Sequence, residues 1–248
     1  MLIIISRCAS VKLGWERDLL AREIIKYAVY RTPILRKAMA PTYKYKISPG
    51  QIAALINLIN DTRESEGVIV EIGVAQGDTS VFILEHMRTT GDSRKVFLFD
   101  TFDGFTSESI EYEINLRGKS AAFFDKFRYG SEAIFSKNLT SAGYSNFITR
   151  KGDAAKFDWS ALGSIGAVLL DIDLYKPTID VLNNIWPYIV KGGGIIVDDC
   201  LSGTPWDGSL QAYEEFIATH EIPFRRVGNK GGLLLKDHSS KREGVLTD

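Results

Sequence analysis

The stretch Val168-Leu169-Leu170-Asp171-Ile172-Asp173-Leu174-Tyr175-Lys176-Pro177 decides the fold of this chain. Its beginning, residues 167–170, is continuously apolar, which is typical of a parallel strand that is buried on both faces. The strand ends abruptly at Asp171, and a second carboxylate, Asp173, follows two residues later. Because open α/β sheets bind ligands just beyond the carboxyl ends of such strands, the stretch predicts both a fold class and the position of a site.

A second stretch has the same form, since the apolar run 194–197 is followed by Asp198 and Asp199. If the two strands are neighbours, Asp171, Asp198 and Asp199 converge on one edge of the sheet. Three carboxylates at short range repel one another unless a proton or a cation joins them, and a hard divalent cation with oxygen ligands is the simplest solution. The alternative is that these residues cap the helices that follow.

The overall composition is that of an ordinary globular protein, with 248 residues, 45% hydrophobic and 25% charged. The formal net charge of -1 gives no reason to expect a nucleic-acid partner, and the basic residues Arg225, Arg226 and Lys230 are expected to lie on a solvated surface. No apolar run approaches the ~20 residues of a membrane helix. Two cysteines, Cys8 and Cys200, are too few for a disulfide framework, so a cytoplasmic setting is expected.

The first 50 residues differ from the rest of the chain. Apolar residues recur with a helical period over 15–30, and the apolar start at 1–5 suggests a strand or a packed arm. We expect residues 1–50 to form a helical cap or arm that packs over the core or over a partner subunit in a homo-oligomer. A capping box, Ser48 and Gln51 around Pro49, predicts the first helix of the main domain, which covers 51–238 and precedes a tail at 239–248.

A strand over 68–72, a glycine-rich turn over 73–80 and a helix that continues over 81–87 form the first half of a nucleotide-binding unit. Gly73 and Gly77 allow a ligand to approach the backbone, and the helix start is electropositive, so Thr79 and Ser80 join the expected cofactor site.

This glycine turn is not the dinucleotide fingerprint, because Ala75 and Asp78 stand where glycines are required. Glu71, directly before the turn, instead suits a cationic ligand portion such as the amino group and sulfonium of S-adenosylmethionine. A glycine turn without a ligand is the alternative.

Two further acids follow later strands. Asp100 ends the strand over 95–100, where nucleotide-binding folds place the carboxylate that takes the ribose hydroxyls, a feature that NAD enzymes share. Asp153 follows the strand over 146–149 and is expected to accept a hydrogen bond from an adenine amino group. Nearby Trp159 either lines the adenine pocket or packs in the core.

Residues 101–146 are too long for an ordinary connection. We interpret 106–130 as a mobile lid over the acceptor, with a plain surface insertion as the alternative, and 131–140 as a covering helix. Beyond Pro177, a helix over 177–188 is expected to stop at the glycines 192–194. A helix over 209–220 then leads to strands over 224–227 and 232–235. This order predicts an α/β, doubly wound Rossmann-like sheet whose last strand is antiparallel, the usual fold of class I methyltransferases.

The residues Phe99-Asp100-Thr101-Phe102-Asp103-Gly104-Phe105, together with the motifs at 171–178 and 192–199, resemble the macrocin and mycinamicin type of sugar O-methyltransferases. The resemblance spans about 67–236. It implies an S-adenosylmethionine- and Mg²⁺-dependent enzyme whose acceptor is a hydroxyl of a sugar or a glycosylated natural product. By position it implies Asp171, Asp198 and Asp199 as metal ligands, Asp171 as general base, and a cofactor site that includes Glu71, Gly73, Gly77 and Asp100.

The resemblance lapses at 200–208, where the loop after Asp199 departs from the family pattern, and over the first 50 residues. Lys176 is a second candidate for the base, and Asp173 is expected to cap a helix or to support the metal ligands. A catechol-type O-methyltransferase is the nearest alternative function. A nicotinamide-dependent oxidoreductase and a non-catalytic nucleotide-binding protein are more remote, because the first lacks its glycine fingerprint and the second has no use for convergent carboxylates.

Overall fold

The computed structural model describes residues 18–36, 41–43, 45–128 and 130–236, and it divides into two units at Lys44 and Tyr45. In the first unit, residues 18–31 are helical, as the periodicity predicts, and α2 (Pro33–Arg36) follows. The expected strand or arm at 1–5 and the tail at 239–248 lie outside the described residues. The cap and the homo-oligomer remain predictions.

The second unit is built on a seven-stranded sheet in the order β3-β2-β1-β4-β5-β7-β6. Its strands are β1 (Val68–Ile72), β2 (Val96–Asp100), β3 (Phe147–Lys151), β4 (Ile165–Leu170), β5 (Ile189–Val197), β6 (Arg226–Val227) and β7 (Gly231–Leu235). The first five strands are parallel, and β7 is antiparallel to both β5 and β6. This topology confirms the predicted doubly wound sheet with an antiparallel last strand.

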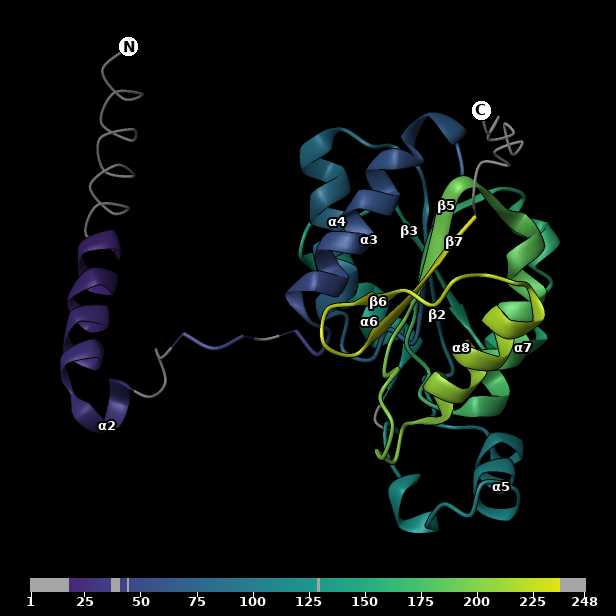
Figure 1. The fold of residues 1–248 in the computed structure, drawn as a ribbon. Coiled ribbons are helices and arrows are strands. Elements are labelled where there is room, and N and C mark those ends of the chain that lie inside the picture. The colour runs from purple at the N-terminus through teal and green to yellow at the C-terminus, as the bar shows by residue number, and fades with distance from the viewer. Residues whose placement is uncertain (1–17, 37–40, 44, 129, 237–248) are drawn as a thin grey trace, which may run out of the picture. The chain divides into compact units, whose positions relative to one another are not determined.

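Helices cover both faces of the sheet (Figure 1). On one face lie α3 (Pro49–Asp61), α4 (Asp78–Thr90) and α6 (Glu132–Ser141), and on the other lie α7 (Tyr175–Ile185) and α8 (Gly208–Thr219). The apolar run at 167–170 lies in β4, which is buried on both faces. Ala167 and Leu169 pack against the first group of helices, and Val168 and Leu170 pack against the second. Each such buried leucine contributes about 1.5–3 kcal/mol of hydrophobic stabilisation.

The helix α3 begins as its capping box predicts. The side chain of Ser48 accepts from the backbone of Gln51, and the Gln51 side chain accepts from the backbone of Ser48. Gln51 is fully buried, and its side-chain amide also donates a hydrogen bond to Asp198 at the end of β5.

One connection differs from the prediction, and a second is shorter than an ordinary helical crossover. The glycines at 192–194 do not stop a helix, since they lie within β5, and α7 has already ended at Ile185. A Cβ on Gly194 would lie 2.2 Å from the carbonyl oxygen of Leu234, so this glycine allows β7 to approach β5. The crossover from β3 to β4 consists of the 3-10 turns η4 (Ala154–Lys156) and η5 (Trp159–Leu162) rather than a helix.

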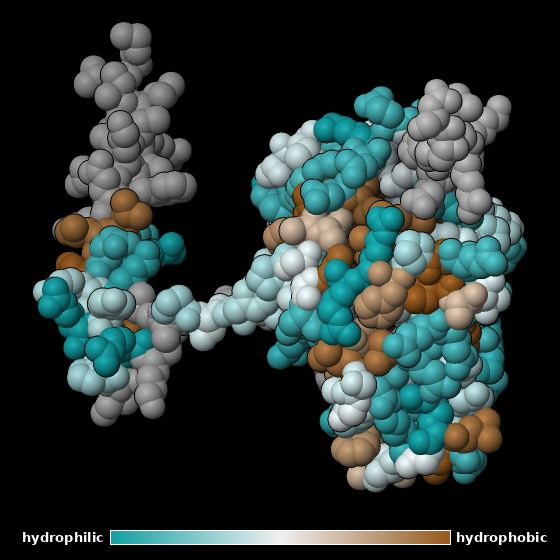
Figure 2. Space-filling model, in the orientation of Figure 1, coloured by the Kyte–Doolittle hydropathy of each residue, from teal (hydrophilic) through white to brown (hydrophobic). Residues whose placement is uncertain are grey.

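None of the helices in the described part of the chain is long and apolar enough to cross a membrane. Figure 2 shows a mainly hydrophilic surface on the visible face of the second unit, with apolar residues in scattered patches. This pattern fits the two apolar layers that the sheet and its helices enclose.

Candidate active site

The register of the sheet places the acidic residues side by side. Leu170 pairs with Val197 in the last step of the ladder between β4 and β5, and with Ile72 in the last step of the ladder between β1 and β4. The amide of Asp171 donates to the carbonyl of Ile72 at 2.8 Å, and the amide of Asp198 donates to the carbonyl of Leu170 at 2.9 Å. The two acidic strand ends are therefore positioned by backbone hydrogen bonds, as the sequence predicts.

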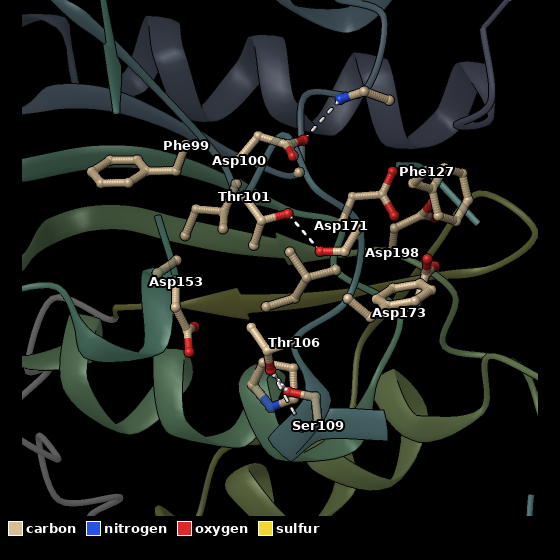
Figure 3. Close-up of a pocket in the computed structure, with 18 of the residues that line it drawn as sticks. Phe99, Asp100, Thr101, Thr106, Ser109, Phe127, Asp153, Asp171, Asp173 and Asp198 are labelled. Atoms are coloured by element: carbon tan, nitrogen blue, oxygen red, sulfur yellow. Dashed lines mark hydrogen bonds between the residues drawn. The ribbon is translucent and has the colours of Figure 1, made fainter. Parts of the chain in front are cut away.

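A cavity of about 470 Å³ opens at this edge of the sheet (Figure 3). Its volume lies within the range of about 300–1,000 Å³ that is typical of small-molecule sites. The lining residues come from the glycine turn, the end of β2, the predicted lid and the loops after β4 and β5; they include Lys46, Gly73, Asp100, Phe105, Phe127, Asp153, Asp171, Asp173, Asp198, Asp199, Trp206 and Lys230. The cavity is therefore lined by residues of the predicted metal site, the predicted cofactor site and the predicted lid.

Three carboxylates converge inside the cavity. Oxygens of Asp171, Asp173 and Asp199 all lie within 4.8 Å of one another. Burial and the neighbouring carboxylates raise the pKa of Asp171 and of Asp173 well above the usual range. Oxygen ligands at this spacing, with negative charge in excess, fit a hard divalent cation such as Mg²⁺. We call these three residues the acidic cluster.

Asp198, which the sequence placed among the metal ligands, has two protein partners in the structure, and its role as a ligand stays a prediction. Asp198 is 1% exposed, and it accepts from Gln51 Nε2 at 2.6 Å and from Lys230 Nζ at 2.7 Å. Lys230 also donates to Asp199 Oδ1 at 2.7 Å. Burial alone would lower the pKa of Lys230, but Asp198 and Asp199 raise it. The prediction of a solvated Lys230 was wrong, because the turn between β6 and β7 brings it to the end of β5.

Asp173 was expected to cap the following helix or to support the metal ligands, and the structure does not give it the capping role. The N-cap residue of α7 is Leu174, whose side chain makes no capping hydrogen bond. The first helical amide, that of Tyr175, donates instead to Glu113 Oε1 at 2.8 Å. With the cap supplied by Glu113, Asp173 joins the acidic cluster.

Three of the residues predicted to bind the cofactor line the cavity: Gly73, Asp100 and Asp153. Gly73 has a φ of +88°, and a Cβ there would lie 1.8 Å from the carbonyl oxygen of Asp171, so only glycine allows β1 and β4 to meet at this point. Asp100 accepts from the amides of Val74, Ala75 and Phe102. Since an ionised carboxylate offers about four acceptor positions, one stays available for a ligand hydroxyl.

The other predicted cofactor residues lie behind the cavity. Glu71 is 1% exposed and accepts from Ser80 Oγ at 2.5 Å, and burial raises the pKa of Glu71 to about 8. Gly77 packs against the ring of Phe135, and Thr79 is half-buried on α4. These residues support the glycine turn without lining the cavity.

Asp153, the residue predicted to accept from adenine, lines the cavity, and its carboxylate also accepts from the amide of Ala155 at 3.0 Å. Trp159 is 2% exposed and packs against Phe99 and Phe157, which resolves its two readings in favour of the core. Lys176, the second candidate base, pairs with Asp180 and does not line the cavity.

Backbone strain is concentrated at this cavity. Seven described residues other than glycine have a positive φ, and five of them line it: Ala75, Phe102, Phe127, Asp173 and Asp199. Left-handed conformations cost free energy in residues with a Cβ, and they persist where the surrounding structure imposes a functional geometry.

Aromatic side chains also line the cavity. Phe105, Phe127 and Trp206 line the cavity, and we call them the aromatic wall. Phe127 belongs to the predicted lid at 106–130, which contains α5 (Ser107–Asn115) and the 3-10 turn η3 (Ala121–Phe123). Residues of this segment line the cavity, while its role as a mobile lid over the acceptor remains a prediction.

Sequence reasoning missed Gln51, Lys230 and the two lid residues Glu113 and Arg117. A signal existed for Lys230, because the glycines around it predict a turn, and an antiparallel last strand beside β5 would bring that turn to Asp199. No local signal exists for Glu113, whose partner amide is 62 residues away in the chain.

Comparison with known proteins agrees with this geometry. A family model described as a methyltransferase domain matches residues 70–200. A curated relative from Streptomyces olivaceus, an 8-demethyl-8-(2,3-dimethoxy-alpha-L-rhamnosyl)-tetracenomycin-C 4'-O-methyltransferase, is 29% identical over 148 residues. That match covers 54% of this chain and 52% of the relative, so it spans about half of each protein.

Solved structures share the fold. The O-methyltransferase NovP superposes with a TM-score of 0.64 at 18% identity, over 79% of this chain and 84% of NovP. CalS11, a calicheamicin methyltransferase, superposes with a TM-score of 0.61 at 20% identity, over 86% of this chain and 90% of CalS11. The strand order, the glycine turn and the family model agree, and the chain belongs to the methyltransferase domain family.

Proposed function

We propose that this protein is an S-adenosylmethionine- and Mg²⁺-dependent O-methyltransferase whose acceptor is a hydroxyl of a sugar or of a glycosylated natural product. One observation carries the proposal: the acidic cluster of Asp171, Asp173 and Asp199 lies in the same cavity as Gly73 and Asp100. The relative from Streptomyces olivaceus, whose name describes methylation of a rhamnosyl group, supports the choice of acceptor.

The cofactor lies along the first two strand ends in this proposal. Gly73 leaves room for its methionine portion beside the turn, and Asp100 accepts from its ribose hydroxyls. Asp153 lies further along the cavity, where it accepts from the adenine amino group. This arrangement directs the sulfonium methyl group towards the acidic cluster.

Methyl transfer is a displacement in line with the carbon–sulfur bond. The acceptor oxygen forms a bond to the methyl carbon, the carbon–sulfur bond breaks, and sulfur keeps the electron pair as a neutral thioether. A protonated sugar hydroxyl is a poor nucleophile, so its proton must leave. Asp171, the predicted base, and Asp173 can both receive it in their ionised form, because both carboxylates line the cavity beside the acceptor.

Mg²⁺, when bound, neutralises negative charge that develops on the acceptor oxygen. Asp171, Asp173 and Asp199 fit it by number, charge and spacing. Asp198 was also predicted as a ligand, and in the proposal it orients Asp199 through Lys230, which donates to both carboxylates.

Two variants test the proposal. We expect Asp171→Asn to lower labelled-methyl transfer by at least about 100-fold, since it removes one anionic ligand and one base. Lys176→Ala should keep full activity, because Lys176 pairs with Asp180 outside the cavity. Calorimetry with Mg²⁺ should show weaker binding to Asp171→Asn and unchanged binding to Lys176→Ala.

Full activity of Asp171→Asn would contradict its assignment as ligand and as base together. Tight binding of NAD without binding of S-adenosylmethionine would favour the oxidoreductase alternative. Preference for a catechol over all glycosylated acceptors would favour the catechol-type enzyme.

A further inference from the structure

Lys46 brings a positive charge to the lining of the cavity. Its two neighbours in the chain are packed: the ring of Tyr45 lies 5.5 Å from that of Phe82 on α4, and Ile47, 1% exposed, belongs to the core beside α3 and α4. Lys46 itself is exposed, and it makes no ion pair with any residue in the described part of the chain. The packed neighbours therefore hold Lys46 at the cavity while its ammonium group stays available to a ligand.

The other positive charges near the cavity already have partners. Lys230, the second cation of the described lining, donates to both carboxylates that follow β5, at 2.7 Å each. Lys126 does not line the cavity, and its ammonium group lies 5.2 Å from the centre of the Trp206 ring, a cation–π distance. Mg²⁺, when bound, belongs to the acidic cluster in the proposed function. Among the described lining residues, Lys46 is thus the cation whose charge no protein group balances.

The glycine turn has little to offer an anion at this cavity. The amide of Gly73 donates to a carbonyl of β2 at 2.8 Å, and the amides of Val74 and Ala75 donate to Asp100 at 3.0 Å and 3.1 Å. The amides that follow belong to residues 76–80, which do not line the cavity. Although anions commonly bind where a glycine turn leads into a helix, the part of this turn that borders the cavity has already used its amides.

The cofactor of the proposed function carries one carboxylate, in its methionine portion. This group enters a cavity whose described lining is rich in acids: Asp100, Asp153, Asp171, Asp173, Asp198 and Asp199. Like charges at short range repel, so the carboxylate needs a cationic donor beside it. A charge-assisted hydrogen bond from an ammonium group is the strong form of such a contact. With Lys230 and the amides of the turn engaged, Lys46 is the lining residue that can donate it.

We propose that Lys46 binds the α-carboxylate of S-adenosylmethionine and so fixes the amino-acid end of the cofactor. The inference rests on the proposed function and deepens it, because it adds a cofactor-binding residue that lies outside the glycine turn, in the segment before α3. Asp100 and Asp153 then hold the nucleoside end, and Lys46 holds the opposite end. Since Lys46 is exposed, its contact with the carboxylate is screened by salt.

The experiment compares two ligands that differ in the carboxylate alone. S-adenosylhomocysteine and its decarboxylated form, which keeps the amino group, are titrated by calorimetry into the full chain and into Lys46→Met. We expect the wild type to bind S-adenosylhomocysteine about tenfold more tightly than the decarboxylated form, as one hydrogen bond between charged groups provides. Lys46→Met should bind the two equally, because methionine has a similar length and no charge. Added NaCl should weaken S-adenosylhomocysteine binding more in the wild type than in the variant.

Two control variants and one control condition isolate the charge of Lys46. Lys46→Arg keeps the charge and should retain most of the preference for S-adenosylhomocysteine. Lys137→Met, on an exposed part of α6 outside the cavity, makes the same change of charge and should match the wild type. Titrations with and without excess Mg²⁺ separate Lys46 from the metal, because a carboxylate bound by Mg²⁺ would give a preference that follows the Mg²⁺ concentration and persists in Lys46→Met.

Three results would overturn the inference while leaving the proposed function in place. They are equal weakening of both ligands in Lys46→Met, an undiminished preference for S-adenosylhomocysteine in that variant, and a change of KM for the acceptor alone, which would assign Lys46 to the acceptor. In each of them S-adenosylhomocysteine still binds. A wild type that binds neither S-adenosylhomocysteine nor S-adenosylmethionine would overturn the proposed function, and the role of Lys46 with it.

Discussion

The cavity has two walls that are held in different ways. The strand-end wall carries Gly73, Asp100 and the acidic cluster, and backbone hydrogen bonds of the sheet continue into it. The aromatic wall is held by side-chain charges between the lid and the loop at 200–208. Backbone hydrogen bonds are made by main-chain groups that nearly every residue carries, whereas an ion cluster depends on each charged side chain. In the proposed function, the strand-end wall carries the chemistry and the aromatic wall contacts the acceptor, so a change in the ion cluster is expected to affect the acceptor first.

The largest effect that separates the walls is expected from Arg117→Met. Glu113 is fully buried, and this variant leaves its charge without the guanidinium. Removing one partner of a buried ion pair typically costs about 3–5 kcal/mol of the free energy of unfolding. Urea denaturation should show this loss. Below the unfolding transition, KM for the acceptor should rise while S-adenosylhomocysteine affinity stays constant.

The double variant Glu113→Gln/Arg117→Met is the matched control. The glutamine keeps an oxygen for the amide of Tyr175 and carries no charge, so much of the lost stability should return. Equal stability of Arg117→Met and the wild type would show that the aromatic wall does not depend on these charges, and the contrast between the walls would fail.

A smaller effect is expected behind the strand-end wall, at Glu71. Burial raises the pKa of Glu71 from 4.5 to about 8, so the folded protein retains a proton that the unfolded chain has released between these pH values. The stability that this proton provides is present below pH 4.5 and is lost as the pH rises to about 8, by about 1.4 kcal/mol per pH unit at most. Glu71→Gln should remove this slope.

The measurement is urea denaturation of Glu71→Gln and of the wild type from pH 5 to pH 9. We expect the variant to gain relative stability up to about pH 8, by about 3 kcal/mol, and then to keep a constant difference. Glu64→Gln, on an exposed turn, is the control and should follow the wild type. A constant difference between Glu71→Gln and the wild type at every pH would contradict the buried, protonated carboxyl.

The smallest effect is expected from Lys230→Met, which tests how a neighbouring positive charge affects the acidic cluster. Lys230 is a resident cation beside Asp199, and removing a like charge near a cation site strengthens cation binding. Calorimetry should show about tenfold tighter Mg²⁺ binding, an effect of about 1.4 kcal/mol. Without Mg²⁺ the variant should be less stable than the wild type, because Asp198 and Asp199 then repel each other. Weaker Mg²⁺ binding by Lys230→Met would mean that Lys230 mainly orients the ligands.

Much of the strand-end wall could be predicted from the chain because its signals are local. An apolar run that ends in Asp171 predicts a buried strand and a carboxylate at its end, and the same holds for Val197 and Asp198. Gly73 was predictable in the same way, because it belongs to a glycine-rich turn that directly follows a strand. The side-chain partners were not predictable, since the sequence could not show that Gln51 and Lys230 would engage Asp198, or that Glu113 would replace Asp173 as the cap of α7.

The sequence by itself determined the order of the elements along the chain and the edge of the sheet where ligands bind, because apolar periodicity and turn residues act over a few positions. The resemblance of its motifs to a known family implied the methyltransferase character. The tertiary structure alone decided which carboxylates form the acidic cluster and which aromatic rings line the same cavity. Those choices depend on the contacts of Lys230 and Arg117 with residues 31 to 94 positions away, and the energy of such contacts exists only after the chain has folded.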